Sequence, residues 1–483
     1  MLNDLTSYPA LQGAFKGDLL LPSDDGYGQS VKRFAATAQK PAGLVAFVKD
    51  ERDIQAVLSF AKEENIEIAV KCGGHSVSGA SSTSGGIVID LSRYLNKVTV
   101  NVEQKIAHVG GGATWKDVDL ATSPHGMASV AGTVSHTGVG GLILGGGYGY
   151  LTGEFGLVID NLLSARLVDS HGVVHECSES ENQDLFWAIR GGGGNFGIVT
   201  SFSLRLHPQR SEVFMADLHF PGEKVVQFFE ALGEWLTVQT EKDLLFVFVQ
   251  DMGNGPVLMA HCLHNGPLED GKKHYKAFYD LGPIVDTTEM IPYLSLNQAI
   301  DDDRPYGTGL YWHGTIFPSP ITHPEAGQKL WESYYDVCMK EPEFSKSTFT
   351  ILEFHHPSKL MEKSNGEMAF NNRGEQINML IGIGWDGILG NQPFEKAKKH
   401  AKRIANAASD KGEQEDGYAN WESNTPTGYD RSIRAFGDKY PRLQALKARY
   451  DPSNMFNKWH PIEPKAECDT LRCMPIAFDV HGL

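Results

Sequence analysis

The hydrophobic and polar positions of residues 40–206 form strand-like segments that alternate with helix-like segments. We expect helices over Glu51–Asn65 and Asn182–Arg190. A hairpin is expected where Ala165–Asp169 and Val173–His175 flank a polar turn that contains glycine. The other apolar runs predict strands at Ala42–Val48, Ile66–Lys71, Ile87–Leu91, Lys97–Asn101, Ile106–Gly110 and Ile198–Leu206.

The pattern changes near residue 211, where long amphipathic helices begin to alternate with strands. This alternation is typical of an antiparallel sheet backed by helices. The segments concerned are the helices Gly222–Thr240 and Pro324–Lys340 and the strands Leu244–Gln250, Val257–His264 and Gln376–Trp385. Residues 430–465 return to short helices and to a turn at Asp451-Pro452. We therefore expect an α+β protein whose middle part differs from both ends.

The composition limits the classes of protein to which this chain can belong. A chain of 483 residues is long enough for about two or three domains. The net charge of −17 argues against a nucleic-acid partner, and the basic run Lys396–Arg403 is expected to be a solvated helix face. No apolar stretch is long enough to span a membrane, and the first residues lack a signal-peptide pattern.

The six cysteines have no metal-binding or framework spacing, so we expect reduced thiols and an intracellular, cytoplasmic protein. A bridge between Cys468 and Cys473 is the alternative for the tail.

Two glycine-rich loops hold the most informative chemistry. Val70–Gly79 follows a predicted strand, and seven of the twelve residues of Gly138–Gly149 are glycine. Such density marks places where the backbone approaches something closely, and consecutive N–H groups in such turns can hold phosphate. His75 lies between Gly74 and Ser76 in the first loop. It is either an ordinary loop histidine or the anchor of a large phosphate-bearing cofactor, and the paired loops favour the anchor.

A Rossmann interpretation of Gly192–Gly197 fails, although the segment satisfies G-x-G-x-x-G. That fingerprint needs a strand before it and a helix after it, whereas here a helix precedes and a strand follows. No Lys-Ser/Thr pair supports a P-loop either.

Five motifs are distributed over the chain, namely Lys71–Ser76, Gly85–Leu91, Gly138–Gly149, Asp184–Gly191 with Asn195–Thr200, and Tyr450–Phe456. Together they resemble the FAD-linked oxidases of the vanillyl-alcohol oxidase superfamily, in their berberine-bridge-enzyme-like branch. The resemblance implies a two-domain α+β fold in which a substrate domain splits the FAD-binding (vanillyl-alcohol oxidase type) domain. The expected limits are residues 1–210 and 430–483 for the FAD domain and 211–429 for the substrate domain.

The resemblance also implies that the flavin is joined covalently to His75. A second tether in many relatives is a cysteine, at a position that is Val134 here, and a histidine of the same loop is replaced by Leu142. Attachment to one histidine is therefore expected, and Thr137 lies where relatives control oxygen access. The matching cofactor-binding positions are Lys71, Cys72, Gly73, Gly74, Ser76, Gly79, Val134, Thr137, Gly138, Gly140, Gly141, Leu142, Gly145, Tyr148, Gly149, Gly197, Ile198, Asn420 and Asn457.

The family places catalytic tyrosines at positions that match Tyr148 and Tyr418. Ionising a free tyrosine at neutral pH costs about 4 kcal/mol, so a cation or hydrogen bonds must stabilise a tyrosinate. Relatives often carry Lys-x-Gln on a neighbouring strand, but the equivalent segment, residues 378–381, is largely apolar. Tyrosinate chemistry is therefore open, and each tyrosine can instead be an aromatic with a paired hydroxyl.

Other polar candidates are His355 and His356, of which at most one can face a pocket because neighbouring strand residues point to opposite faces. No metal site is expected.

The expected protein is thus an FAD oxidase of a small organic molecule that attacks a C–H beside oxygen or nitrogen, or closes a ring, and reduces O2 to H2O2. The alternatives are a flavoprotein with a non-redox cyclase or binding role and a dehydrogenase with another acceptor. Neither the substrate nor the oligomeric state follows from the sequence.

Overall fold

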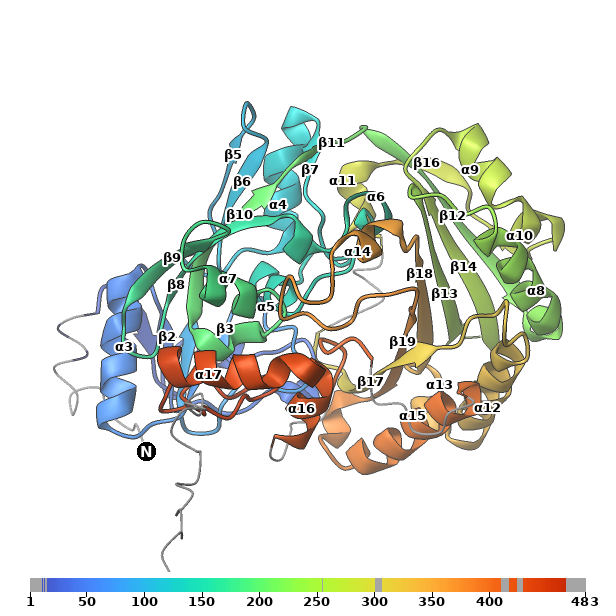
Figure 1. Cartoon of the computed structure of the whole chain (residues 1–483). Helices are drawn as coiled ribbons and strands as arrows, with labels where there is room; N and C mark the ends of the chain where they lie inside the picture. The colour runs from blue at the N-terminus through green and yellow to red at the C-terminus, as the bar shows by residue number, and fades with distance from the viewer. Residues whose placement is uncertain are drawn as a thin grey trace, which may run out of the picture.

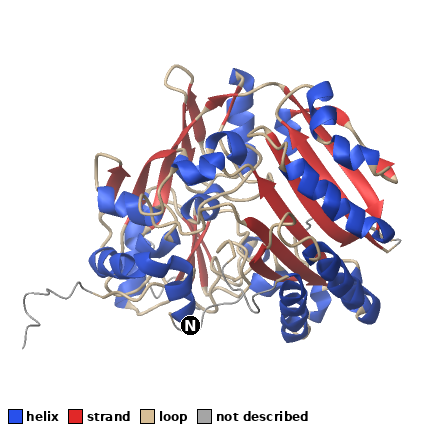
Figure 2. Cartoon of the chain, turned by 45° about the vertical axis from the view of Figure 1, so that its right-hand side comes forward, coloured by secondary structure: helices blue, strands red, loops and turns tan. Residues whose placement is uncertain are grey.

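The computed structural model describes residues 15–253, 255–299, 306–409, 417–423 and 429–465, together with residues 11 and 13. Within them, strands form a four-stranded, a five-stranded and an eight-stranded sheet and one two-stranded pair. Figure 1 shows the N-terminal sheets on one side and the eight-stranded sheet on the other. In Figure 2 most helices lie on the outside of these sheets.

The N-terminal part holds the two smaller sheets. The first has the order β1 (Asp18–Leu20), β2 (Leu44–Phe47), β4 (Ile87–Asp90), β3 (Ile68–Lys71), and β4 is parallel to both β2 and β3. The second is antiparallel, with the order β5 (Val98–Asn101), β6 (Ile106–Gly110), β10 (Ile198–Arg205), β8 (Leu162–Val168), β9 (Val174–Ser178). The pair is β7 (Met127–Ala128) with β11 (His207–Pro208).

The eight-stranded sheet is antiparallel and built from residues 212–385. Its order is β15 (Val285–Asp286), β12 (Glu212–Pro221), β14 (Pro256–His264), β13 (Asp243–Asp251), β18 (Phe349–His355), β19 (Ile377–Trp385), β17 (Gly309–Phe317), and β16 (Glu289–Pro292) pairs with β12. Every residue of β19 is buried. Both faces of the sheet are therefore covered at this strand.

Helices cover the outer face of this sheet, on the right in Figure 1. They are α8 (Val225–Leu236), α12 (Ala326–Lys340) and α15 (Phe394–Ala408). In α15 the buried residues Ala397, Ala401, Ile404 and Ala408 recur every three or four positions, which places them on one stripe. These stripes pack on β-strand residues of the same core, such as Val247 and Leu352.

The remaining helices are short or flank the N-terminal sheets. Asp50 caps α3 by accepting hydrogen bonds from the N–H groups of Arg52 and Asp53. The helices are α2 (Tyr27–Ser30), α3 (Glu51–Glu63), α4 (Trp115–Thr122), α5 (Val139–Leu144), α6 (Thr152–Phe155), α7 (Gln183–Ile189), α9 (Leu268–His274), α10 (Lys276–Asp280), α11 (Tyr293–Leu296), α13 (Pro342–Ser345), α14 (Ser358–Glu362), α16 (Asp430–Phe436) and α17 (Tyr440–Tyr450).

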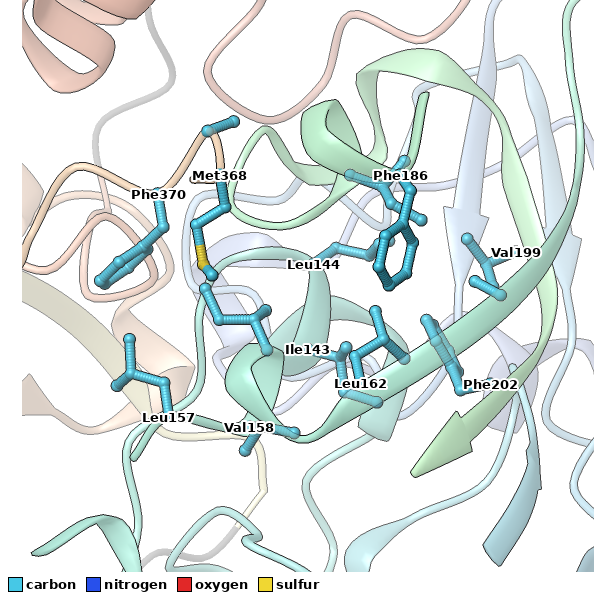
Figure 3. Close-up of a cluster of buried hydrophobic side chains, with 14 of the residues drawn as sticks. Ile143, Leu144, Leu157, Val158, Leu162, Phe186, Val199, Phe202, Met368 and Phe370 are labelled. Carbon is cyan, nitrogen blue, oxygen red and sulfur yellow. The ribbon is translucent and has the colours of Figure 1, made fainter. Parts of the chain in front are cut away.

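One core joins segments that are distant in the sequence. Figure 3 shows Met368 and Phe370 in the same buried cluster as Ile143 and Leu144. Tyr418 and residues of α17 belong to this cluster as well. Residues from the predicted substrate domain thus complete the core of the N-terminal part, and the limits at 210 and 430 stay a prediction.

The element predictions agree with the structure to within a few residues, including the hairpin of β8 and β9. At the rejected dinucleotide motif, α7 precedes a 3-10 turn at Gly193–Phe196 and β10 follows, as expected. Among the helices of the described residues, none is both long and apolar enough to cross a membrane. Cys468 and Cys473 lie outside the described residues.

Candidate active site

The two glycine-rich loops meet backbone to backbone. A Cβ added to Gly73 would lie 2.4 Å from the nitrogen of Gly138, and one added to Gly138 would lie 2.3 Å from the nitrogen of Gly73. Real side chains do not tolerate such distances, so both positions need glycine. The first loop leaves β3 and the second enters α5, which brings His75 next to residues 136–138.

His75 is held between an aromatic ring and a second histidine. Its ring stacks on Phe34 with centroids 4.2 Å apart, and its Nε2 lies 2.6 Å from Nδ1 of His136. Burial, with a smaller contribution from the charge of His136, lowers the pKa of His75 to about 3. His75 is therefore neutral at physiological pH.

A cavity of about 330 Å³ opens beside His75 and runs between the N-terminal part and the eight-stranded sheet. Its lining is mostly apolar. Sixteen of the predicted site residues line it, namely Cys72, Gly73, Gly74, His75, Ser76, Val134, Thr137, Gly138, Gly140, Gly141, Leu142, Tyr148, Gly197, Ile198, Tyr418 and Asn420.

Two predicted residues outside the lining have polar contacts of their own. The ammonium group of Lys71 lies 3.0 Å from Asp90, which joins the ends of β3 and β4. Asn457 is exposed and donates a hydrogen bond to the carbonyl oxygen of Asn454. These contacts suffice to explain both residues as supports of the local backbone.

Three predicted glycines outside the lining occupy tight or left-handed positions. A Cβ on Gly145 would lie 2.3 Å from the amide oxygen of Asn420, and one on Gly149 would lie 1.6 Å from the carbonyl oxygen of Ala131. Gly79 has a φ of +78°, a conformation that favours glycine. These glycines shape the loops around the cavity.

Tyr418 and Tyr148 stand side by side at the wall of the cavity, with ring centroids 5.1 Å apart. The Tyr418 oxygen accepts hydrogen bonds from the N–H of Gly147 at 2.9 Å and from the amide of Asn420 at 2.7 Å. Burial nevertheless raises the pKa of Tyr418, although these donors act in the opposite direction. The phenol is neutral at pH 7 and has its own hydrogen left to donate.

Tyr148 differs in its partner. Its hydroxyl donates a hydrogen bond to the carbonyl oxygen of Asn372 at 2.9 Å. Burial raises the pKa of Tyr148 as well, so this tyrosine too is neutral at pH 7.

Glu353 is a site residue that the sequence analysis missed. On β18, Phe349, Ile351 and Glu353 line the cavity at every second position, as strand geometry requires. The carboxylate lies 3.3 Å from Nε2 of His355, whose ring packs against Tyr148 with centroids 5.3 Å apart. Period-two alternation along β18 was the signal that could have found it.

Neither His355, the last residue of β18, nor His356 lines the cavity. His355 lies behind Tyr148 and Glu353 without lining the cavity. The Nδ1 atom of His356 instead lies 3.0 Å from the hydroxyl of Ser358.

The same alternation corrects the interpretation of residues 378–381 as an apolar block. Leu380 lines the cavity, whereas Met379 and Ile381 belong to the core on the opposite face, beneath the helices. Asn378 is paired in register with Glu353. One polar position therefore does lie on the cavity face of β19.

Cys72 lies in the cavity but is not prepared to react. Its thiol donates to the carbonyl oxygen of Ala113 at 3.2 Å, and burial raises its pKa to about 11. The thiolate, which is the reactive form, is therefore scarce at neutral pH.

A cluster of Asp243, His264 and His274 has the composition of a metal site. Each imidazole Nδ1, however, lies 2.7 Å from a carboxylate oxygen of Asp243, the distance of a hydrogen bond. Asp243 also accepts hydrogen bonds from the N–H and the hydroxyl of Thr240. The described residues thus satisfy one another without an ion.

Comparison with known proteins agrees with this geometry. The sequence model of the FAD binding domain matches residues 42–178, and that described as "Berberine and berberine like" matches residues 417–463. FAD-linked oxidoreductase pgmH of Aspergillus terreus is 31% identical over 94% of this chain and 95% of its own length. The chain belongs to the berberine-bridge-enzyme-like FAD-linked oxidoreductases.

Two further proteins are similar to this chain, one in sequence and one in structure. (R)-6-hydroxynicotine oxidase of Paenarthrobacter nicotinovorans is 26% identical over 94% of this chain and 98% of its own. The crystal structure of glucooligosaccharide oxidase of Acremonium strictum superposes with a TM-score of 0.83 at 22% identity, covering 95% of this chain and 99% of that one. The chain thus has the α+β, vanillyl-alcohol oxidase type fold and is an FAD-linked oxidoreductase.

The cavity fits the FAD expected of this family. A Cβ on Gly141 or Gly194 would meet no heavy atom within 4 Å, although both residues line the cavity. These glycines leave open space that the protein itself does not fill. The surfaces that would hold the cofactor are residues 72–76, 137–138, 140–142, 193–194 and 197–199.

Proposed function

We propose that this enzyme is an oxidase whose FAD is joined covalently to His75 alone. Its substrate would be a small organic molecule that loses hydrogen from a C–H beside oxygen or nitrogen, with O2 as the final acceptor and H2O2 as the product. When bound, FAD supplies the two-electron acceptor for that hydrogen. The observation that carries the proposal is that His75, Tyr148 and Tyr418 line one cavity.

Attachment through His75 is supported by its neutral ring and by its fixed position between Phe34 and His136. Nε2 lies 2.6 Å from His136, whereas the polar neighbour of Nδ1 is the hydroxyl of Thr137 at 3.5 Å, so Nδ1 is the less tightly held nitrogen for a bond to the cofactor. Attachment at a single point is supported by Val134, which has no thiol, and by the raised pKa of Cys72.

The tyrosines orient the substrate in this proposal. Tyr418 uses its oxygen to accept two N–H groups, so its hydroxyl hydrogen can be donated to a substrate oxygen or nitrogen. Asn420 holds that oxygen in place from within the same turn. Thr137, beside His75, lies where oxygen would approach, and its small side chain leaves room.

Acid precipitation of the purified protein tests the attachment. We expect the flavin absorbance to remain in the pellet and a flavin mass on the peptide that contains His75. His75→Ala should release the flavin into the supernatant. Flavin that stays bound in this variant would contradict the assignment of the anchor.

Stopped-flow measurements test the oxidase reaction. We expect a substrate to bleach the flavin without air, and air to restore the colour with release of one peroxide per turnover. A substrate that is converted without bleaching would instead support a non-redox cyclase. Slow recovery in air would support a dehydrogenase with another acceptor.

A further inference from the structure

The eight-stranded sheet contributes one wall of the cavity, which we call its floor. This floor combines one carboxylate with a group of apolar side chains. Three neighbouring strands, β17, β19 and β18, present their residues in register. One row across them holds Trp312 and Phe349 on either side of Gly382. A Cβ on Gly382 would lie 2.2 Å from the Phe349 ring, so glycine lets this ring lie flat over β19.

The next rows change from apolar to polar. Ile351 pairs with Leu380, and Glu353 pairs with Asn378. Phe349, Ile351, Glu353 and Leu380 all line the cavity. Four strand residues span about 13 Å, so the floor is apolar over most of this length and acidic at one end.

The charge at the acidic end has little compensation from the protein. Glu353 is 7% exposed, and its hydrogen-bond partner among the described residues is the His355 imidazole, at the long distance of 3.3 Å. The other charged residue of the lining is Lys458, whose ammonium group is paired with Glu67 at 2.5 Å. A buried carboxylate with one weak partner is costly unless a cation or a strong donor joins it.

The aromatic rings of the cavity also favour a cation. Tyr148, Tyr418 and Trp421 line the same cavity as Glu353, and Tyr148 packs against His355, the partner of Glu353. Trp421 packs against Tyr418 with centroids 5.4 Å apart. Ring faces attract ammonium groups, and the net charge of −17 repels anions from the whole molecule.

We propose that the substrate is an amine, whose ammonium nitrogen binds Glu353 and whose apolar or aromatic remainder lies in the slot formed by Trp312, Phe349, Ile351, Leu380 and Trp421. This inference rests on the proposed oxidase function and specifies its substrate class. The C–H bond oxidised is then one beside nitrogen.

The test compares three probes of one shape on the flavin-loaded enzyme: 4-phenylbutylamine, 4-phenylbutanol and 4-phenylbutyrate. Binding is followed by perturbation of the flavin spectrum and by quenching of tryptophan fluorescence, since Trp312 and Trp421 line the cavity. We expect the amine to bind at least about tenfold more tightly than the alcohol, and the butyrate most weakly.

Glu353→Gln should bring the amine and the alcohol within about twofold of each other, because it removes the charge and keeps the shape. Glu362→Gln is the matched control, since it removes an equal charge from an exposed residue of α14 and should leave the preference unchanged. If Glu353→Gln does not fold or loses flavin, Glu353→Asp keeps the charge and should keep the preference for the amine.

Equal binding of the amine and the alcohol by the unmodified enzyme, or a preference that survives Glu353→Gln, would overturn the substrate class. The same samples are precipitated with acid and reoxidised in air. If the flavin is tethered and reoxidises in air but the enzyme does not prefer the amine, the oxidase function stands and only the substrate class is refuted. A preference for the amine together with extractable flavin refutes only the covalent attachment.

Discussion

The Nε2 atom of His75 lies 2.6 Å from Nδ1 of His136, which makes the two imidazoles one hydrogen-bonded pair. Such a bond fixes which ring nitrogen carries the proton and which carries the lone pair. His136 immediately precedes Thr137, so the second glycine-rich loop presents it to the first. The pair therefore connects the two loops at the point where the cofactor would be attached.

His136→Ala is expected to slow covalent flavin attachment at least about tenfold, because one hydrogen bond of this kind contributes about 1.4 kcal/mol to holding the reactive tautomer. The measurement is the flavin fluorescence of the denatured protein band over time after adding FAD to apoprotein. His125→Ala, in an exposed histidine, is the control. Attachment at an unchanged rate would show that His136 has only a packing role.

Tyr418→Phe is expected to slow anaerobic flavin reduction by about a hundredfold or more and to change substrate affinity little. The variant removes the hydroxyl that would orient the substrate, and it leaves the N–H of Gly147 without its acceptor. Tyr148→Phe should have a smaller effect, because that hydroxyl is already donated to Asn372. Equal reduction rates in Tyr418→Phe and the unmodified enzyme would remove Tyr418 from the mechanism.

Lys447→Met is expected to lower the free energy of unfolding by about 3–5 kcal/mol, because it leaves the Asp451 carboxylate buried without its cation. The Lys447 ammonium group lies 2.6 Å from Asp451 and donates to the carbonyl oxygens of Asn195 and Phe456. Phe456 lines the cavity, so flavin retention should fall too. Urea unfolding measures the change. The control is Arg449→Met, in an exposed residue of the same helix. A decrease in the free energy of unfolding below about 1 kcal/mol would contradict this role of Lys447.

Acid should destabilise the protein through His460. Burial lowers the pKa of His460 to about 4, whereas an unfolded histidine has a pKa of about 6.5. As the pH falls below 6.5, the unfolded state takes up the proton first, so this contribution to stability is complete above pH 6.5 and is lost towards pH 4. His460→Gln should reduce the dependence of the free energy of unfolding on pH between pH 6.5 and 4, and the control His125→Gln should not. The measurement is urea unfolding at a series of pH values. The same pH dependence in His460→Gln and the unmodified protein would refute the prediction.

Local signals were enough to predict much of the fold and the two glycine-rich loops that line the cavity. Glycine density, the single histidine between small residues and the order of strand and helix around Gly192–Gly197 are all short-range features. They located His75, both loops and the reversed dinucleotide motif, because backbone conformation depends mainly on neighbouring residues. Tyr148 and Tyr418 were indicated by the family resemblance, and their ring centroids lie 5.1 Å apart although 270 residues separate them in the sequence.

Other features of the cavity and of the core depend on the tertiary structure alone. His136 became a partner of His75 only when two loops met through glycine backbones, and Glu353 became a cavity residue only when β18 took its register between β13 and β19. Met368 and Phe370 likewise entered a core whose other members lie far away in the sequence. Such contacts depend on how segments that are distant in the sequence pack against one another. The sequence by itself determines the local backbone conformation and which residues of a helix or strand share one face.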